Sequence, residues 1–254
     1  NTAEKMGNDK KLGYVPGRVS ETLEYAYSDW CLSVLAEDLG CKEAAAEYFE
    51  RSRSYSKVFD EEQGWFRPRN ADGTWKEWPE EGRLKESYGC VESNLYQQGW
   101  FVPHDIPGMA DLMGGRTKTL ADLTNFFEKC PSDFLWNAYY NHANEPVHHV
   151  PFLFNRLGAP WLTQYWTRAI CNGAYKNKVE GLVGNEDVGQ MSAWYVLSAM
   201  GFHPVCPGET RYELTTPLFD RVEIKLDDRY AKGKKFIIKT VGNASEACYI
   251  QSAK

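Results

Sequence analysis

The sequence predicts a mainly α-helical protein that ends in a small antiparallel β appendage. Two observations predict this fold class. Apolar residues recur at helical spacing through residues 19–203, and short runs after Gly201 alternate between apolar and polar residues as strands do. We therefore expect a helical portion over residues 1–203 and a β-strand portion over residues 204–254.

The first two predicted helices form a hairpin. The first spans residues 20–40, with Ser20 as its N-cap and Gly40 as its end. Its apolar stripe consists of Leu23, Ala26, Tyr27, Trp30, Val34 and Leu35. The second spans residues 42–59, and one of its faces carries Ala45, Tyr48, Phe49, Ser52 and Tyr55. The short joint between them favours two antiparallel neighbours.

Residues 60–90 form a long connection without helical or strand periodicity. Long irregular segments in a compact domain are usually functional or disordered. The aromatic residues of this connection are Trp65, Phe66, Trp75 and Trp78. Their number favours an ordered loop that lines a cleft.

The rest of the chain continues as short helices and then strands. Further helices are predicted at residues 92–102, 107–113, 117–129, 146–156, 159–175 and 187–201. Strands are predicted at residues 211–217, 221–226, 235–241 and 247–252, with a hairpin connection at 227–235. Helices recur in pairs with polar, aromatic loops between them, which is typical of a ring of helical hairpins with its function at one end.

Charge and composition exclude several classes of partner. The 254 residues carry a formal net charge of −6 and no basic run, which disfavours nucleic acid and anionic membranes. No apolar stretch is long enough to span a bilayer. The seven cysteines show no zinc-like spacing, so buried reduced thiols are the simpler interpretation. Nine Trp and fifteen Tyr favour carbohydrate only weakly, because large helical cores also use aromatic residues.

Two carboxylates could perform glycoside hydrolysis, which needs an acid and a second carboxylate. Glu92 and Asp187 each lie near the start of a predicted helix. A helix start lowers the pKa of a carboxylate, which favours Asp187 as a base. Apolar neighbours raise a carboxyl pKa, and Leu95, Tyr96 and Trp100 could do so for Glu92 as the acid. The alternative is that Asp187 is an ordinary first-turn acid and Glu92 a solvated or capping residue.

Other familiar motifs are missing. The sequence contains no HExxH, GxSxG, P-loop or GxGxxG pattern. The adjacent His148 and His149 do not face one ligand on a helix, so polar contacts are the simpler interpretation. The oxygen-rich segment 141–145 could hold a hard cation such as calcium, although EF-hand spacing is absent.

Five long segments together resemble one family. They are TLEYAYSDW (22–30), VFDEEQGWFRPRN (58–70), ESNLYQQGWFVPHDIPGM (92–109), NEPVHHVPFLFNRLGAPWLTQ (144–164) and GNEDVGQMSAWYVLSAMGFHPVCPG (184–208). In this order they resemble the catalytic domain of glycoside hydrolase family 92, the calcium-dependent exo-acting α-mannosidases. The resemblance covers nearly the whole chain and implies part of an (α/α)6 helical barrel.

The resemblance implies an inverting single displacement and gives roles to particular residues. Glu92 matches the general acid, and Asp187 matches the base that activates water. Asn185 stands where many members have an aspartate that supports the base, so we expect it to orient the water. Glu145 is the alternative acid.

The same resemblance implies a Ca²⁺ that binds sugar hydroxyls and helps to distort the mannose ring. We expect Asn144 and Glu145 to lie near this metal. Residues expected to bind substrate or to support those that do are Trp100, His104, Asp105, His149 and Gln190.

The substrate implied is a mannose-containing oligosaccharide of the N-glycan or mannan type, cut at its terminal α-linked mannose. Members that cleave α-1,2 bonds tend to carry a His-Glu pair before the NEP segment, and the loop 129–143 lacks it. The α-1,2, α-1,3 and other α linkages therefore stay open. A non-catalytic carbohydrate-binding helical module and another helical-barrel glycosidase are the alternative functions.

Family members are much longer than this chain. The resemblance therefore implies an N-terminal β-sandwich and earlier barrel helices in the full-length protein. It also implies a periplasmic, cell-surface or secreted location.

Overall fold

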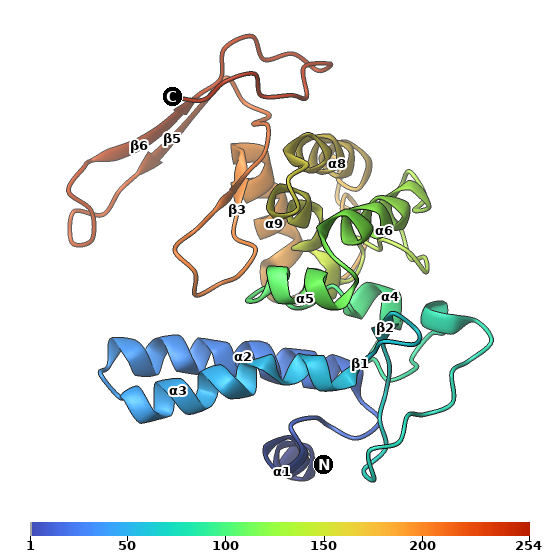
Figure 1. Cartoon of the computed structure of the whole chain (residues 1–254). Coiled ribbons are helices and arrows are strands. Elements are labelled where there is room, and N and C mark those ends of the chain that lie inside the picture. Colours follow the sequence, from blue (N-terminus) through green and yellow to red (C-terminus); the bar gives the residue numbers. More distant parts are fainter. Residues whose placement is uncertain (1) are drawn as a thin grey trace.

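The computed structural model describes residues 2–254 and confirms the mainly helical fold class. Helices account for most of the regular structure before Gly201, and the two longest strands follow Asp220 (Figure 1). In the described chain, no helix is both long and apolar enough to cross a membrane. The division into a helical portion and a β portion at residue 203 stays a prediction. A strand pair, described below, connects the residues on the two sides of this boundary.

The predicted hairpin near the N-terminus is confirmed, with a shorter second helix. Helix α2 (Val19–Asp38) lies beside α3 (Lys42–Arg51), and the 3-10 helix η1 (Ser52–Val58) continues from α3 (Figure 1). A further helix, α1 (Thr2–Leu12), precedes this pair and was not expected.

The buried face of α2 differs from the predicted stripe. Leu35 is 54% exposed, whereas Asp29 and Ser33 are buried. Asp29 faces α3, where its carboxylate accepts a hydrogen bond of 2.9 Å from Nε of Arg51. The predicted N-cap was also wrong, since α2 begins at Val19 and Ser20 lies inside its first turn.

The long connection is ordered, as predicted. Strands β1 (Phe59–Asp60) and β2 (Trp65–Phe66) form an antiparallel pair, and a 3-10 turn, η2 (Gly82–Leu84), lies further along. Trp65 and Phe66 are buried in the core, so neither lines a cleft. The Nε1–H of Trp65 donates to the carbonyl of Leu95 at 2.7 Å, which joins the connection to the next helix.

The remaining helices pack above the α2–α3 pair (Figure 1). They are α4 (Leu95–Gln98), α5 (Ile106–Leu112), α6 (Arg116–Glu128), α7 (Leu153–Arg156), α8 (Pro160–Gly173) and α9 (Gln190–Met200). The helices predicted at 92–102 and 146–156 are mostly wrong. The first is a single turn, and the second breaks into η3 (Glu145–Val147), η4 (Val150–Phe152) and α7. Proline lacks the N–H that a helix interior needs, so Pro151 prevents a continuous helix.

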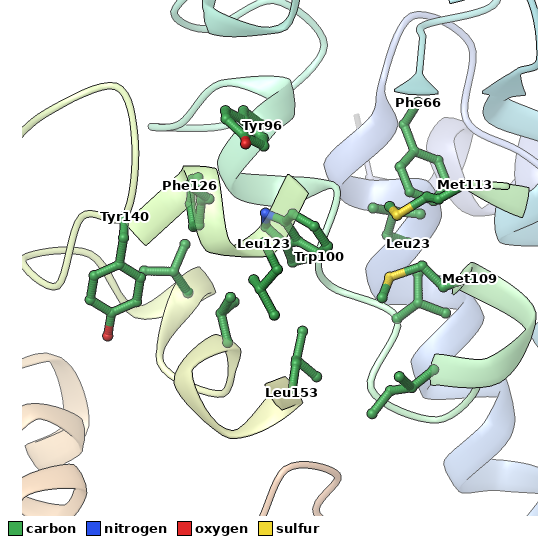
Figure 2. Close-up of a cluster of buried hydrophobic side chains, with 14 of the residues drawn as sticks. Leu23, Phe66, Tyr96, Trp100, Met109, Met113, Leu123, Phe126, Tyr140 and Leu153 are labelled. Carbon is green, nitrogen blue, oxygen red and sulfur yellow. The ribbon is translucent and has the colours of Figure 1, made fainter. Parts of the chain in front are cut away.

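A single aromatic core joins these helices. Trp100 is 0% exposed and lies among Leu23 of α2, Met109 of α5 and Leu123 of α6 (Figure 2). Its ring centroid is 5.2 Å from that of Trp65 in an edge-on arrangement, which is a favourable geometry for aromatic pairs. The core therefore fixes the short helix α4, and with it the loop that carries Glu92.

The β portion consists of small antiparallel pairs. Strand β3 (Phe202–His203) pairs with β4 (Glu213–Leu214). The hairpin of β5 (Arg221–Lys225) and β6 (Lys235–Lys239) is confirmed and extends away from the helices (Figure 1). The strand predicted at 247–252 was wrong, because within residues 2–254 it pairs with no neighbouring strand.

Candidate active site

Three loop segments meet on one side of the core. They are the turn before α4 (92–94), the segment around η3 (141–149) and the turn before α9 (184–189). The Nδ2 of Asn144 donates to the carbonyl of Glu92 at 2.9 Å. The Nε2 of Gln190, the first residue of α9, lies 3.4 Å from Nδ1 of His148. The structure thus connects the Glu92 and Asp187 segments through residues 144–148.

Glu92 is an exposed carboxylate on a strained turn. Its φ is 51°, a left-handed value that non-glycine residues adopt uncommonly and that clusters at functional sites. Asn94, and not Glu92, caps α4, because its side chain accepts from the N–H of Gln97 at 2.9 Å within a capping box. The expected apolar enclosure of Glu92 was wrong. Leu95 and Tyr96 are buried in the core while Glu92 faces solvent.

Asp187 lies in a turn that is separate from the helix after it. The turn η5 (Asp187–Gly189) contains left-handed Val188 and Gly189, so α9 begins at Gln190. Asp187 is therefore not a first-turn acid of α9, and the helix-start position expected for it was wrong.

The neighbouring Glu186 caps α9 with its side chain. Its Oε1 accepts from the backbone N–H of Ser192 at 3.1 Å, one of the free N–H groups at the start of the helix. Because Glu186 performs this task, the exposed carboxylate of Asp187 is left for other contacts. Asn185, on the other side of Glu186, is also exposed.

Gly184 allows the Asp187 turn to lie directly against the η3 segment. A Cβ atom at this position would be 2.1 Å from the carbonyl oxygen of Ala143, closer than real Cβ atoms come to other atoms. The contact is between backbone atoms, which cannot move aside as a flexible side chain can. Only glycine therefore permits this approach, which places the turn beside Asn144 and Glu145.

We expect Gly184→Ala to lower kcat/KM by about 10²-fold, because a misplacement of about 1 Å can cost that much. The added methyl group would push Asp187 away from the η3 segment. Steady-state kinetics on an aryl glycoside substrate would measure the effect. Gly7→Ala is the matched control, since nothing lies within 4 Å of a Cβ there. Unchanged kinetics in Gly184→Ala would contradict a site at this contact.

Asn144 and Glu145 offer oxygen atoms that fit a hard cation. The Oε1 of Glu145 is buried and has no hydrogen-bond partner. An unsatisfied buried acceptor of this kind is costly unless a cation or another donor compensates it. Asn144 donates through Nδ2 to Glu92, which leaves its Oδ1 as an acceptor. Residues 2–254 contain no group of three or more His, Cys, Asp or Glu side chains that could hold a metal. A cation here would therefore depend on amide and carbonyl oxygens as well, as calcium does.

Trp100 and His149 lie beneath the loops. The Nε2–H of His149 donates to the carbonyl of Trp100 at 2.9 Å. Burial lowers the pKa of His149 to about 4, so its ring is neutral at pH 7. This bond connects the residues after α4 to the segment that carries Glu145. Because Trp100 is fully buried, its contribution is this connection and not a face on which a sugar could stack.

His104 and Asp105 have contacts elsewhere. Asp105 caps α5 by accepting from the N–H of Gly108 at 3.0 Å, and the hydroxyl of Tyr55 donates to its other oxygen at 2.6 Å. His104 lies 2.9 Å from the carbonyl of Ser52. Both residues line a separate cavity of about 530 Å³. The contacts of these two side chains hold α5 against η1, which follows α3.

Buried amides that the sequence analysis did not single out fix the loop beside Glu92. Asn94 donates to the carbonyl of Ala138 at 2.9 Å. Gln97 donates to the carbonyls of Asn137 and Tyr139 at 2.7 and 2.8 Å. The Asn-x-x-Gln spacing of a capping box is the signal that could have identified this pair. These bonds hold residues 137–139 in a fixed position next to the Glu92 turn.

The body is mainly helical, and exposed carboxylates lie on loop segments from separate elements, an arrangement that fits a glycoside hydrolase. Residues 1–254 match the model of the glycosyl hydrolase family 92 catalytic domain. The chain belongs to glycoside hydrolase family 92.

Solved structures of the family share the fold. The chain is 33% identical to the inverting mannosidase BT2199 of Bacteroides thetaiotaomicron, with a TM-score of 0.84 over 95% of this chain and 35% of that one. It is 32% identical to the α-mannosidase BT3965 of the same organism, with a TM-score of 0.83 over 92% of this chain and 31% of that one. BT3965 has also been solved in complex with mannoimidazole.

A curated relative is an uncharacterized secreted glycosidase of Arthroderma benhamiae. It is 28% identical over 96% of this chain and 34% of its own length. The chain thus spans about a third of the length of the relatives that it matches.

Proposed function

We propose that the chain forms part of an exo-acting, inverting α-mannosidase that removes terminal α-linked mannose from N-glycan-type or mannan oligosaccharides. One observation carries the proposal. Glu92 and Asp187 are exposed carboxylates that have no capping task, since Asn94 and Glu186 cap the two helices. Both belong to segments joined to residues 144–148. The mannosidases among the solved relatives support mannose as the sugar.

In this mechanism Glu92 protonates the glycosidic oxygen of the leaving group. Asp187 takes a proton from the water that attacks the anomeric carbon on the opposite face. The sugar is released with inverted configuration, and the two carboxyl groups of such enzymes are roughly 6.5–9.5 Å apart. Glu92 is exposed, so a bound sugar would cover it and exclude water from it. In this proposal Asn185, two residues before Asp187, orients the water.

Asn144 and Glu145 would hold the Ca²⁺ in this proposal. The metal, when bound, would attract hydroxyl oxygens of the sugar and help to distort its ring. Glu145 supplies the negative charge, through the buried Oε1 that has no other partner. Asn144 keeps this segment next to the acid through its bond to the carbonyl of Glu92.

Removal of calcium is expected to abolish the activity reversibly. EDTA should reduce hydrolysis of an aryl α-mannoside to near background, and added CaCl₂ should restore it, because without the metal nothing would attract the hydroxyl oxygens of the sugar at Asn144 and Glu145. A control with excess magnesium tests the identity of the ion, since Mg²⁺ demands a stricter octahedral geometry. Full activity after exhaustive EDTA treatment would remove the metal from the proposal.

A substrate screen tests the function itself. The natural gene product that contains this chain should hydrolyse aryl α-mannosides and leave aryl α-glucosides intact. Mannobioses with α-1,2 and α-1,3 bonds would then identify the linkage. Binding of mannose in titration calorimetry without hydrolysis would favour a carbohydrate-binding module, and glucoside hydrolysis would favour another type of glycosidase.

We also propose that the protein acts outside the cytoplasm, at a periplasmic, cell-surface or secreted location. The secreted description of the curated relative supports this.

A further inference from the structure

A chain of buried hydrogen bonds lies beneath the Asp187 turn. His142 is completely buried, and each of its ring nitrogens meets a tyrosine hydroxyl. Its Nδ1 is 2.8 Å from the hydroxyl of Tyr140, and its Nε2 is 2.7 Å from the hydroxyl of Tyr175. The hydroxyl of Tyr175 also donates to the carbonyl of Met191 at 2.9 Å. Met191 is the second residue of α9, the helix that follows the turn carrying Asp187.

The direction of these bonds follows from the donors available. A carbonyl only accepts, so the single hydroxyl proton of Tyr175 goes to Met191. The Nε2 of His142 must then carry a proton and donate it to the oxygen of Tyr175. Its Nδ1 then pairs with the hydroxyl of Tyr140, so both ring nitrogens of His142 have a partner.

Two further bonds hold the start of α9 against the η3 segment. Gln190 approaches His148 through the 3.4 Å contact, and the Nε1–H of Trp194 donates to the carbonyl of His148 at 2.8 Å. The Nε2–H of His148 donates in turn to the carbonyl of His142 at 3.0 Å. The contacts of Gln190 and Trp194 join α9 to His148, and the bond from His148 to His142 fixes His148 within the segment that includes Asn144 and Glu145.

The Asp187 turn depends on this anchor. Left-handed Val188 and Gly189 separate the turn from the regular hydrogen bonds of α9, and Val188 is fully exposed. A β-branched residue in this conformation is strained and persists only where the surroundings fix it. The start of α9 is fixed from below by Tyr175 and Gln190 and from above by the cap of Glu186.

We propose that Tyr175 and His142 are positioning residues that set the place of Asp187 relative to Glu145. The inference rests on the proposed function, in which Asp187 is the base. Tyr175 acts through the backbone of Met191, and His142 orients the hydroxyl of Tyr175. Neither side chain touches the sugar.

A pair of matched substitutions separates positioning from simple stability. Tyr175→Phe removes the hydroxyl that reaches α9, whereas Tyr140→Phe removes the hydroxyl on the other side of the same histidine. Each leaves one ring nitrogen of His142 without a partner, so both should lower the melting temperature. Only Tyr175→Phe should lower kcat, by about tenfold or more, with KM changed less than about twofold. Tyr140→Phe should keep kcat within about twofold of the unsubstituted protein.

Equal losses of kcat in both variants, or unchanged kcat in Tyr175→Phe, would overturn the inference. Hydrogen exchange of the backbone amides at residues 187–192 gives a second readout that needs no substrate. Exchange there should become faster in Tyr175→Phe and stay unchanged in Tyr140→Phe. If the natural gene product hydrolyses no mannoside, the proposed function fails while this exchange result still decides the positioning. Unchanged exchange in Tyr175→Phe would refute the positioning even in an active enzyme.

Discussion

Replacement of Asp187 by asparagine is expected to lower kcat by about 10²–10⁴-fold, the usual contribution of a general base. The amide has nearly the same shape as the carboxylate but cannot take a proton from the attacking water. Because Asp187 is exposed and Glu186 caps the helix, the melting temperature should not change. Steady-state kinetics on an aryl α-mannoside and a thermal melt of the same sample measure the two effects.

Two matched variants complete this test. Asp228→Asn changes an exposed aspartate in the β5–β6 connection and should leave kcat unaltered. Glu186→Gln changes the adjacent carboxylate that accepts from Ser192, so it should weaken α9 and lower the melting temperature. A kcat for Asp187→Asn within threefold of the unsubstituted enzyme would contradict the assignment of the base.

Replacement of Glu92 by glutamine is expected to show a strong dependence on the leaving group. An oligosaccharide leaves as a poor leaving group and needs the proton of Glu92, so kcat/KM on mannobiose should fall by about 10²–10⁴-fold. A dinitrophenyl mannoside leaves as a stable anion without that proton. Its hydrolysis should therefore be affected much less, and the ratio of the two losses is the quantity to measure.

Glu86→Gln is the control for this second substitution, since Glu86 is an exposed glutamate in the connection of residues 60–90, close to Glu92 in the sequence. Glu145→Gln tests the alternative acid. If Glu145→Gln shows the dependence on leaving group and Glu92→Gln does not, the two roles must be exchanged. The burial of the Glu145 Oε1 favours a role in binding the cation. For such a role, Glu145→Gln should lower kcat/KM by a similar factor with both substrates.

The sequence predicted the longer periodic elements and the short helix α5 well, and several other short elements poorly. The α2–α3 hairpin, α6, α8 and the β5–β6 hairpin lie close to their predicted positions, because a sustained apolar period has one stable solution. The apolar residues of 92–102 suggested a helix, but the helix α4 has a single turn and ends at Gln98. Trp100 lies just beyond this end and is buried in the core. The face of α2 was misjudged because the ion pair of Asp29 with Arg51 buries a charged residue, which a count of apolar positions cannot foresee.

The candidate site was predicted in its residues but not in its local geometry. The sequence indicated Glu92 and Asp187 as helix-start acids, whereas the structure places both on turns and assigns capping to Asn94 and Glu186. Left-handed conformations at Glu92 and Val188 caused this difference, and propensities disfavour such conformations for both residue types. The contact of Gly184 with Ala143 joins segments 41 positions apart, so no local pattern could reveal it.

The anomer of the first product tests the central claim most directly. Proton NMR of the reaction in its first minutes, before mutarotation, distinguishes α-mannose from β-mannose. An acid at Glu92 and a water-activating base at Asp187 require β-mannose to appear first from an α-mannoside. Initial release of α-mannose would show a retaining double displacement and would contradict the role proposed for Asp187 as the base that activates water.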